Sequence, residues 1–285
     1  MTRYSIGLLF LLCCSSPKEG QETTASTEKK PLLTSLLNVS FYEPEWSPTQ
    51  KAKLDSNLTV AIKNFESDPS EGNYIWYGRR DRGHRFISIR KFDGAIADFE
   101  KAVDLMKGKL IENEPDGQPN KLNIPLSNTQ FNVWYHLGLA YYLKGDFMKA
   151  ENAYKQCILV SNNNDLLIAT ADWLYMTLRR ENKIKEAEEL LNSISESLVI
   201  IENDSYYQRL MLYKGKQKVD ELLNPDPQSE DYDLALATQG YGVANWYLYS
   251  GDTARANEIF TKIVGGKHFS SFGFIAAEAE LVRMK

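Results

Sequence analysis

The sequence contains few of the residues on which catalytic and metal sites are usually built. It has three cysteines and three histidines among 285 residues, and no C-x-x-C, H-E-x-x-H or G-x-S-x-G pattern occurs in it. The histidines His84, His136 and His268 are never four residues apart, so no helix carries the pair that a zinc-binding helix requires. We therefore predict no catalytic residue, no metal site and no cofactor.

An excess of positive charge and long apolar runs are also missing. Lysine and arginine number 33 against 38 acidic residues, which gives a formal net charge of −5. A general nucleic-acid binder needs many cations to neutralise phosphates, so we expect no nucleic-acid partner. The apolar run at the N-terminus, residues 6–12, is too short to cross a bilayer, which takes about 20 residues as a helix.

That short run does fit the apolar region of a signal peptide. Arg3 precedes it and Cys13-Cys14 follow it, a layout typical of exported proteins. Leu11 lies three residues before Cys14, and this arrangement resembles a bacterial lipoprotein signal. The resemblance implies that residues 1–13 are a signal peptide and that Cys14 becomes the lipidated N-terminus. Lipidation of Cys13 and a plain secretory signal, cut nearby, remain open.

The residues after Cys14 predict a tether followed by a folded part. Residues 15–31 are rich in Ser, Thr, Glu and Lys and cannot bury enough apolar surface to offset the entropy of ordering. We assign residues 14–46 to the lipid anchor and a flexible tether, and residues 47–285 to the folded domain. If Cys14 is lipidated, Cys157 has no cysteine left to pair with, so packing alone must hold the fold together.

The stretch from 134 to 154 carries two helical patterns separated by Gly145-Asp146. The first has apolar or small residues at i, i+3, i+4 and i+7, which is one face of a helix. The second steps by three, four and three residues after the turn. The positions are Trp134, Leu137, Gly138 and Tyr141, then Phe147, Ala150, Tyr154 and Cys157.

The same residues read W-x2-L-G-x2-Y followed by alanine, and this resembles the tetratricopeptide repeat (TPR) over about 131–164. Related segments recur along the chain. The alanine that marks the second helix is found at Ala61, Ala95, Ala150, Ala187 and Ala256, and Asp220 takes its place in a weak repeat.

The resemblance implies an all-α fold, a right-handed α-solenoid of about five TPR-like helix pairs. We expect an entry helix over 49–66, helix pairs over 74–109, 129–160, 166–197, 205–224 and 232–264, and a capping helix over 269–284. The segment 111–130 is rich in Asn and Pro and predicts an insertion loop. In the first pair Arg79 and Arg82 stand where Trp134 and Leu137 stand, so the register is least certain there.

In TPR proteins the first helix of each pair lines a concave groove that holds a peptide or protein partner. Carried over by spacing, the groove would be lined by Arg80, His84, Tyr135, Leu139, Tyr142, Asp172, Arg179, Arg209, Tyr241 and Asn245. Tyrosine and arginine are frequent at binding hot spots, and arginine pairs with carboxylates in bidentate fashion. We therefore expect an acidic protein or peptide partner, unless the arginines are merely solvated or bridge neighbouring repeats.

The sequence thus favours a non-catalytic scaffold, exported and held by lipid on the bacterial cell envelope. Two alternatives remain open. One is an enzyme or ligand sensor that combines the 111–130 loop with the arginine and histidine residues of the groove. The other is a secreted TPR protein without lipid. The oligomeric state and the identity of the partner do not follow from the sequence.

Overall fold

The computed structural model of the chain describes residues 31, 33–41, 83–114, 120, 122–223 and 232–285. The predicted signal peptide, Cys14, the entry helix over 49–66 and Arg80 lie outside the described residues. The described part is mostly helical, which confirms the all-α class. The handedness of the solenoid and the number of repeats stay predictions.

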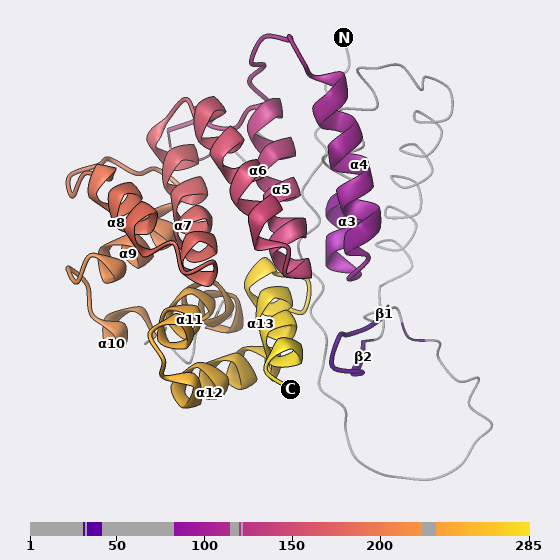
Figure 1. The fold of residues 1–285 in the computed structure, drawn as a ribbon, viewed down its shortest axis with the longest axis vertical. Helices are drawn as coiled ribbons and strands as arrows, with labels where there is room; N and C mark the ends of the chain where they lie inside the picture. Colours follow the sequence, from indigo (N-terminus) through magenta and orange to yellow (C-terminus); the bar gives the residue numbers. More distant parts are fainter. Residues whose placement is uncertain (1–30, 32, 42–82, 115–119, 121, 224–231) are drawn as a thin grey trace.

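Most consecutive helices pack on each other, and α9 packs on α7 and α11. Figure 1 shows α3 and α4 on one side of the molecule, α8 and α9 on the other, and α11, α12 and α13 below them. Their bounds are α3 Gly83–Ser88, α4 Phe92–Leu105, α5 Thr129–Lys144, α6 Phe147–Val160, α7 Asn164–Arg180, α8 Ile184–Ser193, α9 Asp204–Tyr213, α10 Val219–Leu222, α11 Tyr232–Tyr249, α12 Thr253–Val264 and α13 Phe272–Arg283.

The Gly-Asp pairs form the turns, as the sequence predicts. Gly145 ends α5 in the left-handed conformation with φ 87°, which glycine adopts at little steric cost. The Asp146 side chain then accepts a hydrogen bond from the Lys149 N–H and so caps the start of α6. Gly251, with φ 94°, and Asp252 repeat this arrangement between α11 and α12.

The small residues of the repeat allow the helices to approach closely. The marker alanines Ala95, Ala150, Ala187 and Ala256 are fully buried. A Cβ atom on Gly138 would lie only 2.7 Å from the Tyr154 ring. A larger side chain at these positions would separate the two helices of a pair. Close packing between the helices therefore explains why the repeat has alanine and glycine there.

The fourth helix pair is the weakest. Its second helix, α10, has four residues, and Asp220 at the marker position is exposed. The sequence predicted a pair over 205–224, whereas the structure has a complete α9 followed by this single turn. An exposed carboxylate cannot replace the buried alanine that joins two helices, so the second helix stays short.

A short hairpin packs on the helices within the range that we assigned to a tether. Strands β1 (Leu33–Thr34) and β2 (Ser40–Phe41) pair antiparallel. Leu33 is buried, and the Phe41 ring stacks on Phe269 with centroids 4.5 Å apart. The polar composition on which the tether rests ends before these residues, so the structure corrects its extent for residues 33–41.

Helix α13 does more than cap the last pair. It packs against α11 and α12, as the sequence predicts, and it also contacts α5, far back in the chain (Figure 1). A Cβ atom on Gly273 would lie 2.1 Å from the Ala237 carbonyl oxygen, so glycine permits this close approach to α11. The end of the chain therefore folds back over the first helices of earlier pairs.

Candidate functional site

The residues predicted to line the concave groove are mostly buried. Seven of the ten expose less than a tenth of their surface, namely Tyr135, Leu139, Tyr142, Asp172, Arg209, Tyr241 and Asn245. Helices α11 and α13, which contact α7 and α5, help to enclose this inner side. The prediction of an open groove at these positions is therefore wrong for this structure. Sequence spacing placed them on one face but could not show that the chain would cover that face.

At the centre of the inner side, Asp172 and Arg209 form a buried ion pair between α7 and α9. Arg209 Nε donates to Asp172 Oδ1 at 3.1 Å, and the second guanidinium nitrogen donates to the other carboxylate oxygen. Arg209 also donates to the Thr238 carbonyl of α11, where Gly242 leaves room for its side chain. This arginine bridges neighbouring helices, which is one of the alternatives that the sequence left open.

Burial changes the ionisation of the Asp172 carboxyl. Complete burial raises the pKa of the Asp172 carboxyl to about 6, although the attraction of Arg209 opposes the shift. A buried pair of this kind contributes less to stability than its Coulomb energy suggests, but loss of one partner leaves a costly unpaired charge. With its carboxylate partner inside the protein, Arg209 is not available to an acidic ligand.

A second polar network joins α5 to α11. Tyr142 Oη accepts hydrogen bonds from Tyr241 Oη and from Asn245 Nδ2, both at 2.8 Å. The Trp173 ring lies against both tyrosines, with centroids 5.2 Å from Tyr142 and 5.6 Å from Tyr241. Burial raises the pKa of Tyr142 to about 12, so the phenol remains neutral and donates or accepts without charge.

Two carboxylates of α13 complete the inner side, and no sequence pattern pointed to either of them. Glu280, fully buried, pairs with Arg180 of α7 and with Arg283. Burial opposes its ionisation, but the two arginines outweigh this effect and hold its pKa below the ordinary value. Glu278 pairs with Arg90 of the α3–α4 turn, whose Nη2 also donates to the Phe269 carbonyl at 2.7 Å.

The remaining members of the predicted set lie elsewhere. Arg179, at the end of α7, is partly exposed, and its guanidinium lies 4.4 Å from the centroid of the Tyr249 ring. His84 belongs to α3, and only its backbone is described. Arg80 lies outside the described residues. An acidic partner was expected because of Arg80, His84, Arg179 and Arg209, and Arg209 is buried against Asp172.

The predicted insertion loop, residues 111–130, contacts the ends of helices. Its described residues hold the ends of helices, since Asn120 Nδ2 donates to Glu202 and Asn163 Nδ2 donates to the Leu126 carbonyl. Its last residues form the start of α5, where Asn128 Oδ1 accepts from the Phe131 N–H at 2.7 Å. The loop thus connects the ends of α5, α7 and α9.

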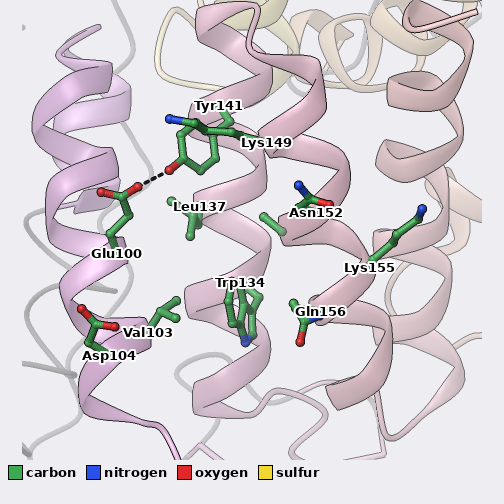
Figure 2. Close-up of a pocket in the computed structure, with 11 residues that line it drawn as sticks. Glu100, Val103, Asp104, Trp134, Leu137, Tyr141, Lys149, Asn152, Lys155 and Gln156 are labelled. Carbon is green, nitrogen blue, oxygen red and sulfur yellow. Dashed lines mark hydrogen bonds between the residues drawn. The ribbon is translucent and has the colours of Figure 1, made fainter.

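An open groove does exist, on a different side of α5. It lies between α4 and α6 and has a volume of about 610 Å³. Figure 2 shows Trp134, Leu137 and Tyr141 along its floor. The α4 side carries Glu100, Val103 and Asp104, and the α6 side carries Lys149, Asn152, Ala153, Lys155 and Gln156. We call this the α4–α6 groove.

The two ends of the α4–α6 groove differ. At one end Tyr141 donates a hydrogen bond to Glu100, and the Lys149 ammonium lies 5.2 Å from the centroid of the Tyr141 ring (Figure 2). Burial and the bond to Glu100 raise the pKa of Tyr141. The other end, around the partly exposed Trp134, carries the exposed Gln156 on its α6 side. An apolar floor between polar edges suits binding to another molecule.

The described residues show no other arrangement that suggests chemistry. Cys157 is buried beside Thr170, and burial raises the pKa of its thiol to about 12, so it is a packing residue rather than a nucleophile. Within the described ranges no group of three or more His, Cys, Asp or Glu residues could hold a metal ion. None of the helices described there has both the length and the apolar character needed to span a membrane.

Comparison with known proteins agrees with the repeat. A family model described as the tetratricopeptide repeat matches residues 131–164. These are the residues over which the sequence pattern predicted a repeat, so that prediction is confirmed. No curated protein matches the chain. Tetratricopeptide repeats commonly mediate protein–protein interactions, which supports a non-catalytic binding role and a protein partner in general terms.

Proposed function

We propose that this protein is a non-catalytic scaffold that binds a protein partner in the α4–α6 groove. The observation that carries the proposal is the contrast between two sides of α5. Tyr142, on the inner side, is fully buried, whereas Trp134 is partly exposed on the floor of an open groove. Aromatic floors of this kind are typical of the energetic centre of a protein interface.

The size and openness of the α4–α6 groove favour a protein segment over a small ligand. Small-molecule sites enclose most of the surface of their ligand. Here the edge residues Asp104, Asn152 and Gln156 are themselves exposed, so the groove is open to solvent. A segment lying along α5 could contact the floor and both edges at once.

Site-specific photo-crosslinking tests this function. A photoreactive amino acid in place of Asn152 lies in the α4–α6 groove, and the same residue in place of Asn192 on α8 is an exposed control outside it. We expect a discrete crosslinked protein from native cells at position 152 and none at 192. Absence of a specific product at 152, in a chain with an unchanged circular-dichroism spectrum, would contradict the function.

We further propose that the protein is exported and held on the bacterial cell envelope by lipid at Cys14. The proposal is supported by the apolar run over 6–12 and by Leu11 three residues before that cysteine. In cells given labelled palmitate, the wild-type chain should take up label and sediment with membranes, and Cys14→Ser should do neither. Label retained by Cys14→Ser would point to Cys13, and a wild-type chain that stays soluble and takes up no label would point to a secreted protein without lipid.

A further inference from the structure

We propose that the α4–α6 groove binds an amphipathic helix, with basic side chains facing α4, acidic side chains facing α6 and an apolar stripe on the floor. This inference rests on the proposed function and adds the class of segment that the partner supplies. It starts from the shape of the floor. Trp134, Leu137 and Tyr141 are spaced i, i+3 and i+7, so they form a single stripe along α5.

A straight stripe of this length matches the apolar stripe of another helix. Seven residues of α-helix rise about 10.5 Å, which is about two turns. A helix bound in a groove presents anchors at i, i+3, i+4 and i+7, at the same spacing. The α4–α6 groove is bordered by two helices that both pack on α5. A bound helix would therefore lie where an additional helix of the repeat array could pack.

The charges of the two sides differ in sign. Both ionisable residues on the α4 side, Glu100 and Asp104, are acidic, and both on the α6 side, Lys149 and Lys155, are basic. Glu100 and Asp104 are four residues apart and so share one face of α4. A helix with flanks of opposite charge complements both sides, whereas uniformly charged flanks would be repelled on one of them.

These four charges already have contacts within the chain, and two of those contacts are exposed ion pairs. Asp104 pairs with Lys107 at 2.7 Å, and Lys155 pairs with Glu151 at 2.5 Å. Lys149 lies 3.7 Å from Asp146. Ion pairs of exposed side chains contribute about 0–1 kcal/mol, so a partner helix can compete for Asp104 and Lys149. The Glu151 carboxylate that holds Lys155 is buried and also pairs with Lys183, so it keeps a cation if Lys155 turns to a partner. The Glu100 carboxylate accepts from Tyr141 and has a second oxygen for a basic ligand.

Three synthetic helical peptides test the inference by binding to the purified full chain. All carry leucine at i, i+3 and i+7. One has lysine on one flank and glutamate on the other, one has lysine on both flanks, and one has glutamate on both. We expect the mixed peptide to bind at least tenfold more tightly than either uniform peptide. A helix bound in the opposite direction would present its two flanks to the opposite sides of the groove. Exchanging the lysine and glutamate flanks would therefore be no control, and peptides with uniform flanks are used instead.

Reversing the charges on the α6 side should change which of the three peptides binds most tightly. In Lys149→Glu/Lys155→Glu both sides of the α4–α6 groove are acidic, so the all-lysine peptide should become the tightest ligand. The matched control Lys185→Glu/Lys216→Glu changes two exposed lysines outside the groove and should keep the preference for the mixed peptide. Equal binding of the three peptides, no binding, or an unchanged preference after reversal would overturn the inference.

The outcome separates this inference from the proposed function. A crosslinked partner at position 152 together with peptides that fail to discriminate would leave the protein-binding function standing and remove the amphipathic helix as its ligand. The absence of a crosslinked partner would instead remove the function. Either result can be obtained without knowledge of the partner's name.

Discussion

Helix α5 has two aromatic surfaces, of which one is buried by later helices and the other lines an open groove. On one, Tyr142 is fully buried and bound by Tyr241 and Asn245 from α11. On the other, Trp134 and its neighbours form the floor of the open α4–α6 groove. Both surfaces are aromatic, so residue type does not distinguish them. What differs is whether a later helix covers them, and this decides which surface stabilises the fold and which is available to a partner.

The strongest test of this comparison is Arg209→Ala on the inner side. It leaves the buried Asp172 carboxyl without its partner, and we expect a loss of about 3–5 kcal/mol in the free energy of unfolding. Urea denaturation followed by circular dichroism measures it. The control Arg255→Ala removes an exposed pair with Asp252 and should leave the unfolding midpoint nearly unchanged. Equal effects of the two changes would contradict the distinction between surfaces.

The pH dependence of stability tests the same pair. Folded Asp172 binds its proton below about pH 6, and the unfolded chain binds it only below about 3.8. As pH falls from 7 to 4, this group therefore stabilises the folded state by up to about 3 kcal/mol, and the gain is lost again as pH rises through 6.

The Asp172→Asn variant cannot take up this proton. The wild type should therefore gain stability relative to the variant between pH 7 and pH 4, measured as the difference between their urea midpoints. A loss of wild-type stability relative to the variant on acidification would show that the attraction of Arg209 outweighs burial.

Close packing of α13 gives a smaller effect. In Gly273→Ala the added Cβ would meet the Ala237 backbone oxygen, which cannot move cheaply, so we expect a loss of about 1–3 kcal/mol in thermal or urea unfolding. Gly265→Ala is the matched control, since its Cβ would find its nearest neighbours at 3.5 Å and beyond. Similar stability of the two variants would mean that α13 does not lie against α11.

The smallest effect on stability is expected in the α4–α6 groove. Asn152 and Gln156 are exposed, so Asn152→Ala/Gln156→Ala should change the free energy of unfolding by less than about 0.5 kcal/mol. The same variant should reduce binding of the mixed-charge peptide, because both amides lie at the groove edge. Unchanged peptide binding would place the binding surface elsewhere.

Much of the fold could be predicted from local patterns. Gly145 with Asp146, and Gly251 with Asp252, mark turns because glycine tolerates positive φ and aspartate caps the next helix. The marker alanines indicate helix contacts because only small side chains fit there. These signals act within one repeat, so a single sequence reveals them. The α4–α6 groove was not predicted, since the spacing places Trp134 on one face of its helix but does not show that this face is partly exposed.

The hairpin over residues 33–41 shows a place where local patterns predicted the wrong structure. Leu33 and Phe41 follow a polar stretch, and the assignment of a tether extended over them. Phe269, on whose ring Phe41 stacks, is more than 200 residues away along the chain. A pattern read within a short window cannot show that such a partner exists.

The sequence by itself determined the helical repeat, its turns and its close contacts, because these depend on residues within about 34 positions of one another. Only the tertiary structure decided which side of the repeat is buried. The pairs that cover the inner side join Tyr142 to Tyr241 across 99 positions and Arg90 to Glu278 across 188. Contacts over such distances depend on how α11 and α13 fold back, and no local spacing encodes that path.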